Sequence, residues 1–197
     1  MYKNIFKPLL DYLLFIIVLP IWLPLMLIIA LIIFTIDGWP LFFIQKRPGK
    51  DNAIFNLIKF RTMNVNGTGN NINRITRLGK FLRSSSLDEI PSFINIFLGH
   101  MSFIGPRPLL VEYLERYSSD QIKRHNVKPG ITGLAQVNGR NAISWSDKLR
   151  FDQKYALNIS FALDVKILIH TFMIVLKREG INSSAQETME EFNNDKR

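Results

Sequence analysis

The longest uninterrupted apolar run in the chain covers residues 12–36, which contain no acidic or basic side chain. As a helix that rises about 1.5 Å per residue, this run is roughly 37 Å long, enough to cross the hydrocarbon core of a bilayer. No small-residue cleavage site follows the run, which argues against a secretory signal peptide. The pattern therefore predicts a membrane-inserted helix within residues 1–36.

Two prolines, Pro20 and Pro24, interrupt this run near its middle. Each removes a backbone N–H donor and clashes with the preceding turn, so we expect a kink or break there. Basic residues flank the run on both sides, Lys3 and Lys7 before it and Lys46 after it, and basic flanks prefer the cytoplasm. A broken helix that enters and leaves on one face keeps both flanks there. A kinked single span with a cytoplasmic C-terminal domain is the alternative.

Beyond residue 36 the apolar segments are shorter and separated by turn signals, which predicts a globular domain at residues 37–180. Two apolar runs on either side of Pro48 and Gly49 predict a β-hairpin over residues 41–60.

Two later segments, residues 74–83 and 161–178, have an amphipathic pattern, and residues 145–157 predict a helix that carries Asp152. The first is basic as well, which is typical of a helix that lies along anionic headgroups. Residues 181–197 are polar and predict a mobile tail. The expected fold is α+β and mainly helical, with a re-entrant N-terminal helix and interfacial amphipathic helices.

Residues 83–108 carry the most distinctive chemistry of the chain. The motif SLDE fits a capping box with Ser86 as N-cap and Glu89 reaching back, although Pro91 also suits a helix start. In either register Asp88 and Glu89 lie at a helix N-terminus, where backbone amides and the dipole favour negative charge. The two carboxylates are therefore either helix-start residues or candidates for binding a divalent cation.

Arg107 stands between Pro106 and Pro108, and the residues that follow have helical spacing. We expect Arg107 to lie rigidly at the start of a second helix, where a guanidinium favours a phosphate oxygen. A phosphate at Arg107 and a divalent cation at Asp88 and Glu89 would together make a phosphoryl-transfer site.

Residues 128–141 are rich in glycine and in polar side chains. The glycines permit close approach of a ligand to the backbone, although an ordinary polar turn fits the pattern equally well. The side chains that could hydrogen-bond a sugar or a base are Gln136, Asn138, Arg140 and Asn141.

The overall charge narrows the choice of partners. The chain has 25 Lys and Arg against 16 Asp and Glu, a net charge of +9, and a basic protein binds polyanions. It has no cysteine, which excludes disulfides and thiolate metal sites, and its three histidines show no ligand spacing. Two alternatives to an enzyme remain open, a membrane-tethered nucleic-acid-binding protein and a membrane scaffolding protein.

Several motifs behind the membrane helix, in this order, resemble the bacterial sugar transferase family: QKRPG, KFRTM, SLDEIP, MSFIGPRPLL and KPGITGLAQVNGRNAISW. The chain is similar to the minimal monotopic members, the polyprenyl-phosphate phosphoglycosyl transferases, from residue 1 to about residue 180. The resemblance implies transfer of a sugar 1-phosphate from a UDP-sugar to undecaprenyl phosphate, with release of UMP, as the first step of a lipid-linked glycan pathway. GRNAISW resembles members that use acetamido-deoxy sugars such as diacetylbacillosamine.

The resemblance also implies roles for individual residues. Asp88 would be the nucleophile and form a phosphosugar intermediate, which the lipid phosphate resolves with ping-pong kinetics. Mg²⁺ would be the cofactor at Asp88 and Glu89, with Glu89 as either metal ligand or general base. Arg107 would bind phosphate. Further substrate-binding positions are implied at Lys59, Arg83, Gln136, Asn138, Arg140, Asn141 and Asp152.

In this family the re-entrant helix is broken at a Ser-Pro pair and enters and leaves on the cytoplasmic face of the bacterial inner membrane. Here Leu23 precedes Pro24, so the break would rest on Pro24, helped by Pro20. Ser92 stands where glutamine usually follows SLDEIP. The implied partners are the UDP-sugar, undecaprenyl phosphate, the bilayer and downstream glycosyltransferases, but no nucleic acid.

Overall fold

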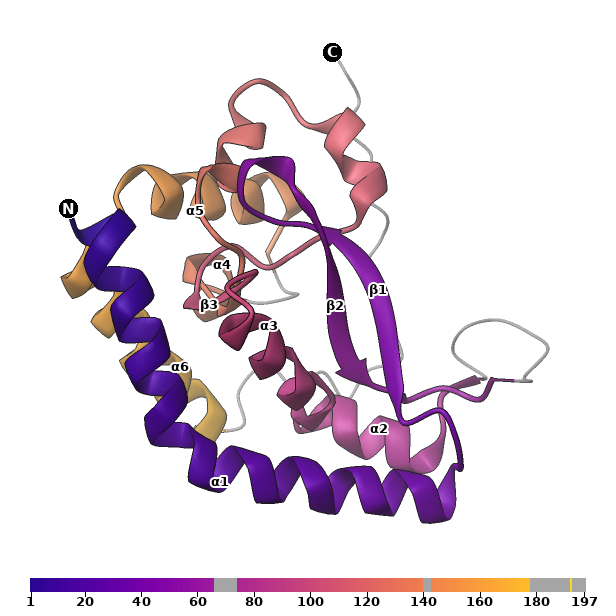
Figure 1. Ribbon diagram of the computed structural model, residues 1–197. Coiled ribbons are helices and arrows are strands. Elements are labelled where there is room, and N and C mark those ends of the chain that lie inside the picture. Colours follow the sequence, from indigo (N-terminus) through magenta and orange to yellow (C-terminus); the bar gives the residue numbers. More distant parts are fainter. Residues whose placement is uncertain (66–73, 140–142, 178–191, 193–197) are drawn as a thin grey trace.

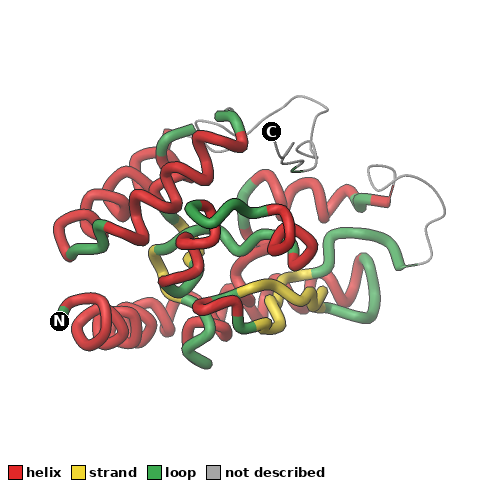
Figure 2. The backbone as a smooth tube through the Cα atoms, turned by 90° about the horizontal axis from the view of Figure 1, so that it is seen from above, coloured by secondary structure: helices red, strands yellow, loops and turns green. Residues whose placement is uncertain are grey.

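The computed structural model describes residues 1–65, 74–139, 143–177 and 192. It has the mainly helical α+β architecture that the sequence predicts, with strands in the middle of the molecule and helices around them (Figure 2). The elements, in chain order, are η1 (Tyr2–Phe6), α1 (Lys7–Ile36), β1 (Phe42–Pro48), η2 (Lys50–Asn52), β2 (Ile54–Phe60), α2 (Arg77–Ser84), η4 (Leu87–Ser92), α3 (Phe93–Phe97), β3 (Ser102–Ile104), η5 (Val111–Arg116), η6 (Gln121–Asn126), β4 (Gly130–Thr132), α4 (Leu134–Val137), α5 (Trp145–Leu157) and α6 (Phe161–Lys177).

The apolar N-terminal run forms α1, which contains Pro20 and Pro24 in its interior. Its ribbon bends midway, so that its two halves frame two sides of the domain (Figure 1). The bend agrees with the kink expected from two prolines that each remove a helix hydrogen bond. Phe15, Trp22 and Ile29, spaced seven residues apart, form one buried stripe of the helix against the domain.

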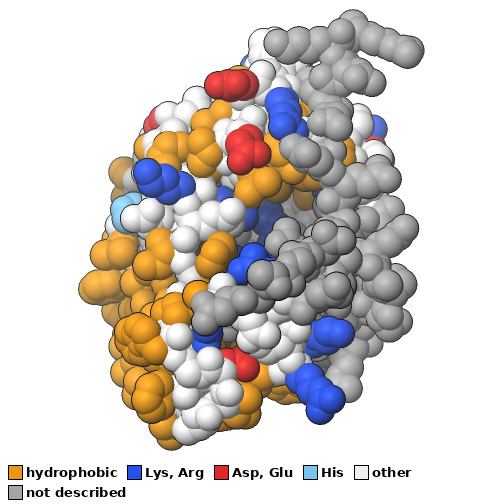
Figure 3. Space-filling model, turned by 90° about the vertical axis from the view of Figure 1, so that its right-hand side faces the viewer, with side chains coloured by type: hydrophobic (Ala, Val, Ile, Leu, Met, Phe, Trp, Pro, Cys, Tyr) orange, Lys and Arg blue, Asp and Glu red, His pale blue; other side chains and the backbone are white. Residues whose placement is uncertain are grey.

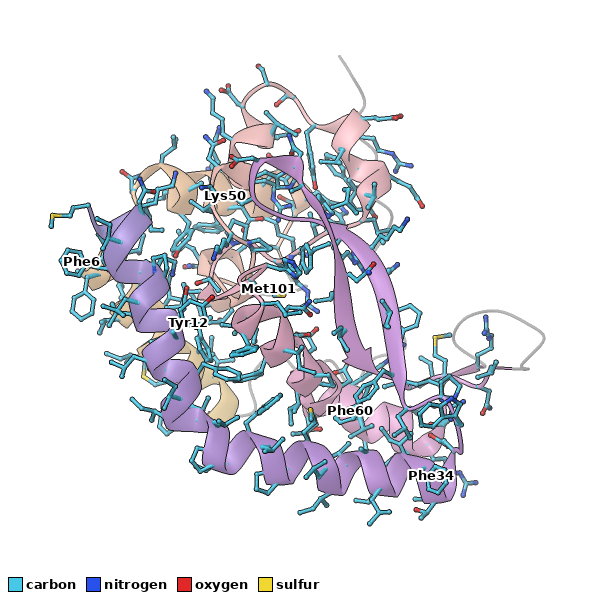
Figure 4. All side chains as sticks on the ribbon, in the orientation of Figure 1. Phe6, Tyr12, Phe34, Lys50, Phe60 and Met101 are labelled. Atoms are coloured by element: carbon cyan, nitrogen blue, oxygen red, sulfur yellow. The ribbon has the colours of Figure 1, made fainter. Side chains whose placement is uncertain are left out.

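Much of the remaining surface of α1 is apolar and exposed. Together with η1 it is long and apolar enough to cross a membrane, judged by length and composition. Phe6 lies near one end of this surface and Phe34 near the other (Figure 4). Ile16, Ile21 and Leu27 lie between them, each well over half exposed. A contiguous apolar surface of this extent is typical of a protein that associates with a membrane.

Buried polar contacts fasten the first half of α1 to the domain. Lys7 Nζ lies 2.8 Å from the Asp164 carboxylate, which also accepts a hydrogen bond from the Tyr155 hydroxyl at 2.7 Å. One turn further along, the Asp11 carboxylate accepts a hydrogen bond from Ser102 Oγ at 2.9 Å. Charges removed from water are costly unless they are paired, so these contacts fix where the helix begins on the domain.

The predicted hairpin is confirmed. β1 and β2 pair antiparallel with Phe42 opposite Phe60 and Pro48 opposite Ile54. Figure 4 shows Phe60 enclosed between the end of the hairpin and the second half of α1. This strand end belongs to the main hydrophobic cluster, which includes Phe15, Trp22, Ile33, Phe60, Leu82 and Ile90.

A second, parallel pair of three-residue strands, β3 and β4, was not predicted. β4 lies in the region 128–141 that the sequence indicated to be a loop, and no element was predicted at β3. Gly105 and Gly130 let the two segments approach closely. A Cβ on Gly130 would lie 2.1 Å from the Gly105 nitrogen, which no real side chain could tolerate. The pair matters because the segment that leaves β3 carries Arg107.

The C-terminal helices match their predicted bounds closely, α5 at both ends and α6 to within one residue. Most of the predicted tail, residues 181–197, lies outside the described residues. Phe192 is the exception: it is buried, with its ring 5.5 Å from Tyr113 and 5.3 Å from Trp145 between ring centroids.

Candidate active site

Asp88 and Glu89 lie on η4, a short 3-10 helix that follows Ser86, a residue in the left-handed region with φ of 59°. The predicted capping box does not form, because Ser86 makes no side-chain cap and the Glu89 side chain turns to cations instead. Pro91 lies inside η4, and the α-helical part begins only at Phe93. The carboxylates therefore sit on an irregular turn ahead of the helix rather than in its first turn.

Glu89 is held between two cations. Lys59 Nζ donates to Oε1 at 2.7 Å, and the Arg107 guanidinium contacts both carboxylate oxygens, with Nη1 3.2 Å from Oε2 and Nη2 at Oε1. Burial by itself would raise the pKa of Glu89, but Arg107 and Lys59 outweigh it and hold the pKa well below its usual range. Glu89 is thus ionised and ties β2, η4 and the segment after β3 together.

Asp88 differs from its neighbour. Its side chain is partly exposed and, within the described part of the chain, has no hydrogen-bond or ion-pair partner. Burial and the charge of Glu89 raise the pKa of Asp88, while Lys59, Arg107 and Arg83 oppose the rise. An unpaired carboxylate whose charge is poorly stabilised is a better nucleophile than one held by cations. The geometry therefore separates an available carboxylate, Asp88, from an organising one, Glu89.

Arg107 does not start a helix, contrary to the sequence prediction. It lies in an extended segment between β3 and η5, flanked by Pro106 and Pro108, and the next helical turn begins only at Val111. A proline disfavours helical geometry in the residue before it, which accounts for the extended path. The Arg107 side chain is 46% exposed, so the guanidinium meets Glu89 and remains accessible to solvent.

A buried arginine, Arg124 on η6, holds the backbone of Arg107 in place. Its Nη2 donates to the main-chain carbonyl of Arg107 at 2.6 Å and to the Asp152 carboxylate at 2.7 Å. Asp152, predicted as a substrate contact, is itself buried in this ion pair. In this structure Asp152 contacts Arg124, and Arg124 in turn contacts the Arg107 backbone, so Asp152 is connected to the site only indirectly.

His125 extends the same network. Its Nε2 lies 3.1 Å from Arg124 Nη1, and its Nδ1 lies 2.5 Å from the side-chain oxygen of Asn52 in the hairpin turn. Burial and the charge of Arg124 lower the pKa of His125 to about 3, so the ring is neutral. The pattern fits an Nδ1–H donor to Asn52 and an Nε2 acceptor from Arg124.

The comparison with known proteins identifies the family of the chain. The family model described as bacterial sugar transferase matches residues 2–178, nearly the whole chain. The chain belongs to the bacterial sugar transferase family. This membership confirms the predicted resemblance and makes the chain a sugar transferase.

Relatives of this sugar transferase cover it to different extents. It is 47% identical over 174 residues to the uncharacterized sugar transferase EpsL of Bacillus subtilis, covering 83% of this chain and 86% of that one. It is 41% identical over 197 residues to the UDP-glucose:undecaprenyl-phosphate glucose-1-phosphate transferase of Klebsiella pneumoniae. It is 36% identical over 168 residues to the undecaprenyl-phosphate galactose phosphotransferase of Salmonella typhimurium. The chain spans only 41% and 35% of the last two proteins.

Of the other predicted substrate contacts in the sugar transferase, Lys59 is at the site and Arg83 is near it. Arg83 Nε donates to Thr62 Oγ1 at 2.8 Å, and its charge lowers the pKa of Asp88 against the larger effect of burial. Gln136 and Asn138 are engaged locally, since each amide nitrogen donates to a main-chain carbonyl at 2.7 Å. The Gln136 Oε1 is buried without a partner in the described structure. The two remaining predicted contacts, Arg140 and Asn141, lie outside the described residues.

Sequence reasoning missed Arg47 as well as Arg124. Arg47 lies near the end of β1, where its Nη2 donates to Gln45 Oε1 at 2.6 Å and its Nε is buried without a described partner. Burial, followed by the charge of Arg107, lowers the pKa of Arg47 to about 10. The QKRPG motif was a signal, because the backbone of a residue before a proline is restricted to extended geometry. Arg124 gave no comparable signal in its polar surroundings.

The two carboxylates of the sugar transferase leave oxygen lone pairs free, so they fit a divalent cation whose other ligands would come from elsewhere. Within the described residues no group of three or more potential ligands forms a complete metal site, but Mg²⁺ commonly uses one or two carboxylates plus phosphates. A carboxylate has about four lone-pair directions, and three contacts from Lys59 and Arg107 occupy those of Glu89. One direction on Glu89 Oε2 and both oxygens of Asp88 remain for a metal ion.

Proposed function

We propose that this sugar transferase moves a sugar 1-phosphate from a UDP-sugar to undecaprenyl phosphate and releases UMP. The names of the Klebsiella and Salmonella relatives support this reaction and its lipid carrier. The observation that carries the proposal is the unpaired carboxylate of Asp88 beside Glu89, Arg107 and Lys59. That arrangement combines a nucleophile with cations that suit a diphosphate. Figure 3 shows basic side chains at the hollowed centre of one face, the kind of surface that attracts an anionic substrate.

The reaction has two displacement steps at one phosphorus. An oxygen of Asp88 attacks the β-phosphorus of the UDP-sugar, and the bond to the bridging oxygen breaks, with its electron pair leaving on UMP. The sugar phosphate is then joined to Asp88 as an acyl phosphate. An oxygen of undecaprenyl phosphate attacks the same phosphorus, restores the Asp88 carboxylate and forms the lipid diphosphosugar.

The residues around Asp88 stabilise charge during both steps. Arg107 and Lys59 neutralise the phosphoryl oxygens, and Glu89 keeps the two cations in place before substrate arrives. A magnesium ion at Asp88 and the free lone pair of Glu89 would supply further neutralisation of the diphosphate. Buried Arg124 keeps the Arg107 backbone at a fixed distance from the carboxylates.

We also propose that α1 is re-entrant and holds the catalytic domain on the cytoplasmic face of the bacterial inner membrane. The bend midway along α1, the prolines Pro20 and Pro24 inside it, its exposed apolar surface and the basic flanks support this topology. The product would enter polysaccharide synthesis, where downstream glycosyltransferases extend the lipid-linked sugar.

The proposed donor carries an acetamido-deoxy sugar, on the strength of the GRNAISW segment. Residues 140–142 of that segment lie outside the described structure. The names of the Klebsiella and Salmonella relatives contain glucose and galactose, respectively. These three sugar classes define the substrates to compare.

A screen for UMP release tests both the reaction and the sugar. Purified protein would be incubated with undecaprenyl phosphate, Mg²⁺ and, in turn, UDP-glucose, UDP-galactose, UDP-N-acetylglucosamine and UDP-diacetylbacillosamine. We expect one sugar class to release UMP, Asp88→Asn to abolish the release, and Asp51→Asn, an exposed position, to leave it unchanged. Full turnover by folded Asp88→Asn would overturn the nucleophile assignment.

A further inference from the structure

The turn that carries Asp88 has little support from its own sequence. Ser86, its N-cap, makes no side-chain hydrogen bond to the turn. Pro91 lacks the N–H that the Asp88 carbonyl would receive in a regular 3-10 turn, where residue i bonds residue i+3. η4 is therefore a short helix with a missing cap and a missing internal hydrogen bond, and other elements must hold it.

One of those elements is the apolar helix itself. Trp22 on α1 donates from its indole Nε1 to the main-chain carbonyl of Ile90 at 2.8 Å, a contact between residues 68 apart in the chain. Ile90 directly follows Glu89 and lies in the same turn as Asp88. Among the described residues, no other side chain of α1 makes a hydrogen bond to η4.

The surroundings of Trp22 fix its indole in place. The residue lies between Pro20 and Pro24, on the stripe of α1 that packs on the domain, and is 8% exposed. Its ring centroid lies 5.9 Å from that of Phe93, in a stacked arrangement, and 5.7 Å from that of Phe15. A buried indole N–H requires an acceptor, and here the acceptor belongs to the catalytic turn.

The opposite side of the turn has its own support. Ser92 Oγ donates to the Ile58 carbonyl on β2 at 2.9 Å, and Lys59 on the same strand holds Glu89. The turn is thus fixed to the hairpin on one side and to α1 on the other. Asp88, which makes no such contact of its own, takes its position from these neighbours.

We propose that Trp22 is a positioning residue for sugar-phosphate transfer. Its indole N–H fixes the Ile90 carbonyl and, through the η4 backbone, the direction of the Asp88 carboxylate. The apolar helix therefore sets the geometry of the nucleophile in addition to attaching the protein to lipid. This inference rests on the proposed function, because it assigns Trp22 a part in the Asp88 displacement.

The test compares Trp22→Phe with Trp39→Phe, a tryptophan that is 73% exposed. Trp22→Phe keeps an aromatic ring against Phe93 and removes the donor. Initial rates of UMP release would be measured over a range of UDP-sugar concentrations in detergent. We expect Trp22→Phe to lower kcat about fivefold, the rate equivalent of one ordinary hydrogen bond, with KM within about twofold of wild type. Trp39→Phe should match wild type in both.

A second variant separates the hydrogen bond from ring size. Incorporation of 3-benzothienylalanine at position 22 replaces the indole N–H by sulfur in a ring of nearly the same volume, so packing is preserved. The same fall in kcat supports the inference even if Trp22→Phe folds poorly. A benzothienyl variant with the kcat of wild type overturns it. Failure of wild-type protein to release UMP from any UDP-sugar would instead overturn the proposed function, so the two failures are distinguishable.

Discussion

Arg124 Nη2 donates a hydrogen bond to the main-chain oxygen of Arg107 at 2.6 Å, so one arginine fixes the backbone of another. The supporting guanidinium is 1% exposed and paired with Asp152, whereas the supported one is accessible at the site. The chain thus uses a buried cation to hold the segment that presents an accessible one. The position of the Arg107 backbone thus depends on Arg124 and Asp152, two residues that a substrate does not need to contact.

Replacing Asp152 by asparagine tests this support. Arg124 would keep its charge in a buried position without a carboxylate, which typically costs about 3–5 kcal/mol of unfolding free energy. We expect a clear fall in the midpoint of thermal unfolding in detergent, together with weaker binding of the UDP-sugar. Asp120→Asn is the matched control, because its pair with Lys123 is exposed and should contribute under about 1 kcal/mol. Equal midpoints for the two variants would contradict the supporting role.

Glu89→Gln tests whether Glu89 organises the two cations. The neutral amide cannot balance Lys59 and Arg107 together, and it loses charge-assisted hydrogen bonds that contribute about 1.5–3 kcal/mol each. We expect the rate of UMP release to fall by roughly 10- to 100-fold. Glu112→Gln, at an exposed position on η5, should retain the wild-type rate. A Glu89→Gln enzyme as fast as the control would show that the cations hold their positions without this carboxylate.

His125 should make stability depend on pH below neutrality. Its folded pKa of about 3 lies below the ordinary value of 6.5, so the unfolded chain takes up the proton first as pH falls. The contribution of neutral His125 to the free energy of unfolding is therefore present above pH 6.5. It is lost as pH falls toward 3, at up to about 1.4 kcal/mol per pH unit. The groups that face the ring are Arg124, Asn52 and, edge to face, Tyr117.

Unfolding free energies at pH 6.5 and pH 5 measure this effect. We expect wild-type protein to lose about 1.6 kcal/mol more than His125→Gln over this interval, because glutamine keeps a donor and an acceptor but does not titrate. Since Asp152 and Arg124 remain in both proteins, the difference isolates the histidine. Parallel pH profiles for the two proteins would rule out His125 as the source.

The membrane topology can be tested with single cysteines, because the chain contains none. Asn4→Cys and Lys50→Cys place exposed thiols before and after α1. In a re-entrant helix, both thiols react with an impermeant maleimide only in inside-out vesicles. A thiol at position 4 that reacts only from the periplasmic side would establish a spanning helix instead.

The sequence predicted elements whose pattern is local. The hairpin carries its own turn signal between two apolar runs, and α5 and α6 carry their own helical pattern. Their bounds could therefore be read with no knowledge of neighbouring elements. β3 and β4 escaped prediction because three residues carry no measurable period and their pairing joins distant segments. The helix expected after Arg107 was wrong, because its two prolines favour an extended chain over the helical spacing that follows.

The site was predicted in the same uneven way. Asp88, Glu89 and Arg107 came from motifs with a direct chemical meaning, whereas Lys59 came from the family resemblance. Glu89, Lys59 and Arg107 meet in space. The supporting partners depend on tertiary contacts that no motif records. Ser92, which departs from the family pattern, finds its partner in a β2 carbonyl 34 residues away, and Trp22 and Arg124 likewise act on main-chain atoms.

The weak local propensity of η4 has a consequence for folding order. The contacts that hold the turn join residues 30 to 68 positions apart, from Lys59 to Glu89 and from Trp22 to Ile90. Closing such loops costs chain entropy before any contact is gained, so turns of this kind form after the hairpin and helices that they join. We therefore expect the carboxylate of Asp88, the proposed nucleophile, to be positioned late in folding. We expect the Asp88 carboxylate of a nascent chain to be aligned for reaction only after the apolar helix has packed on the domain.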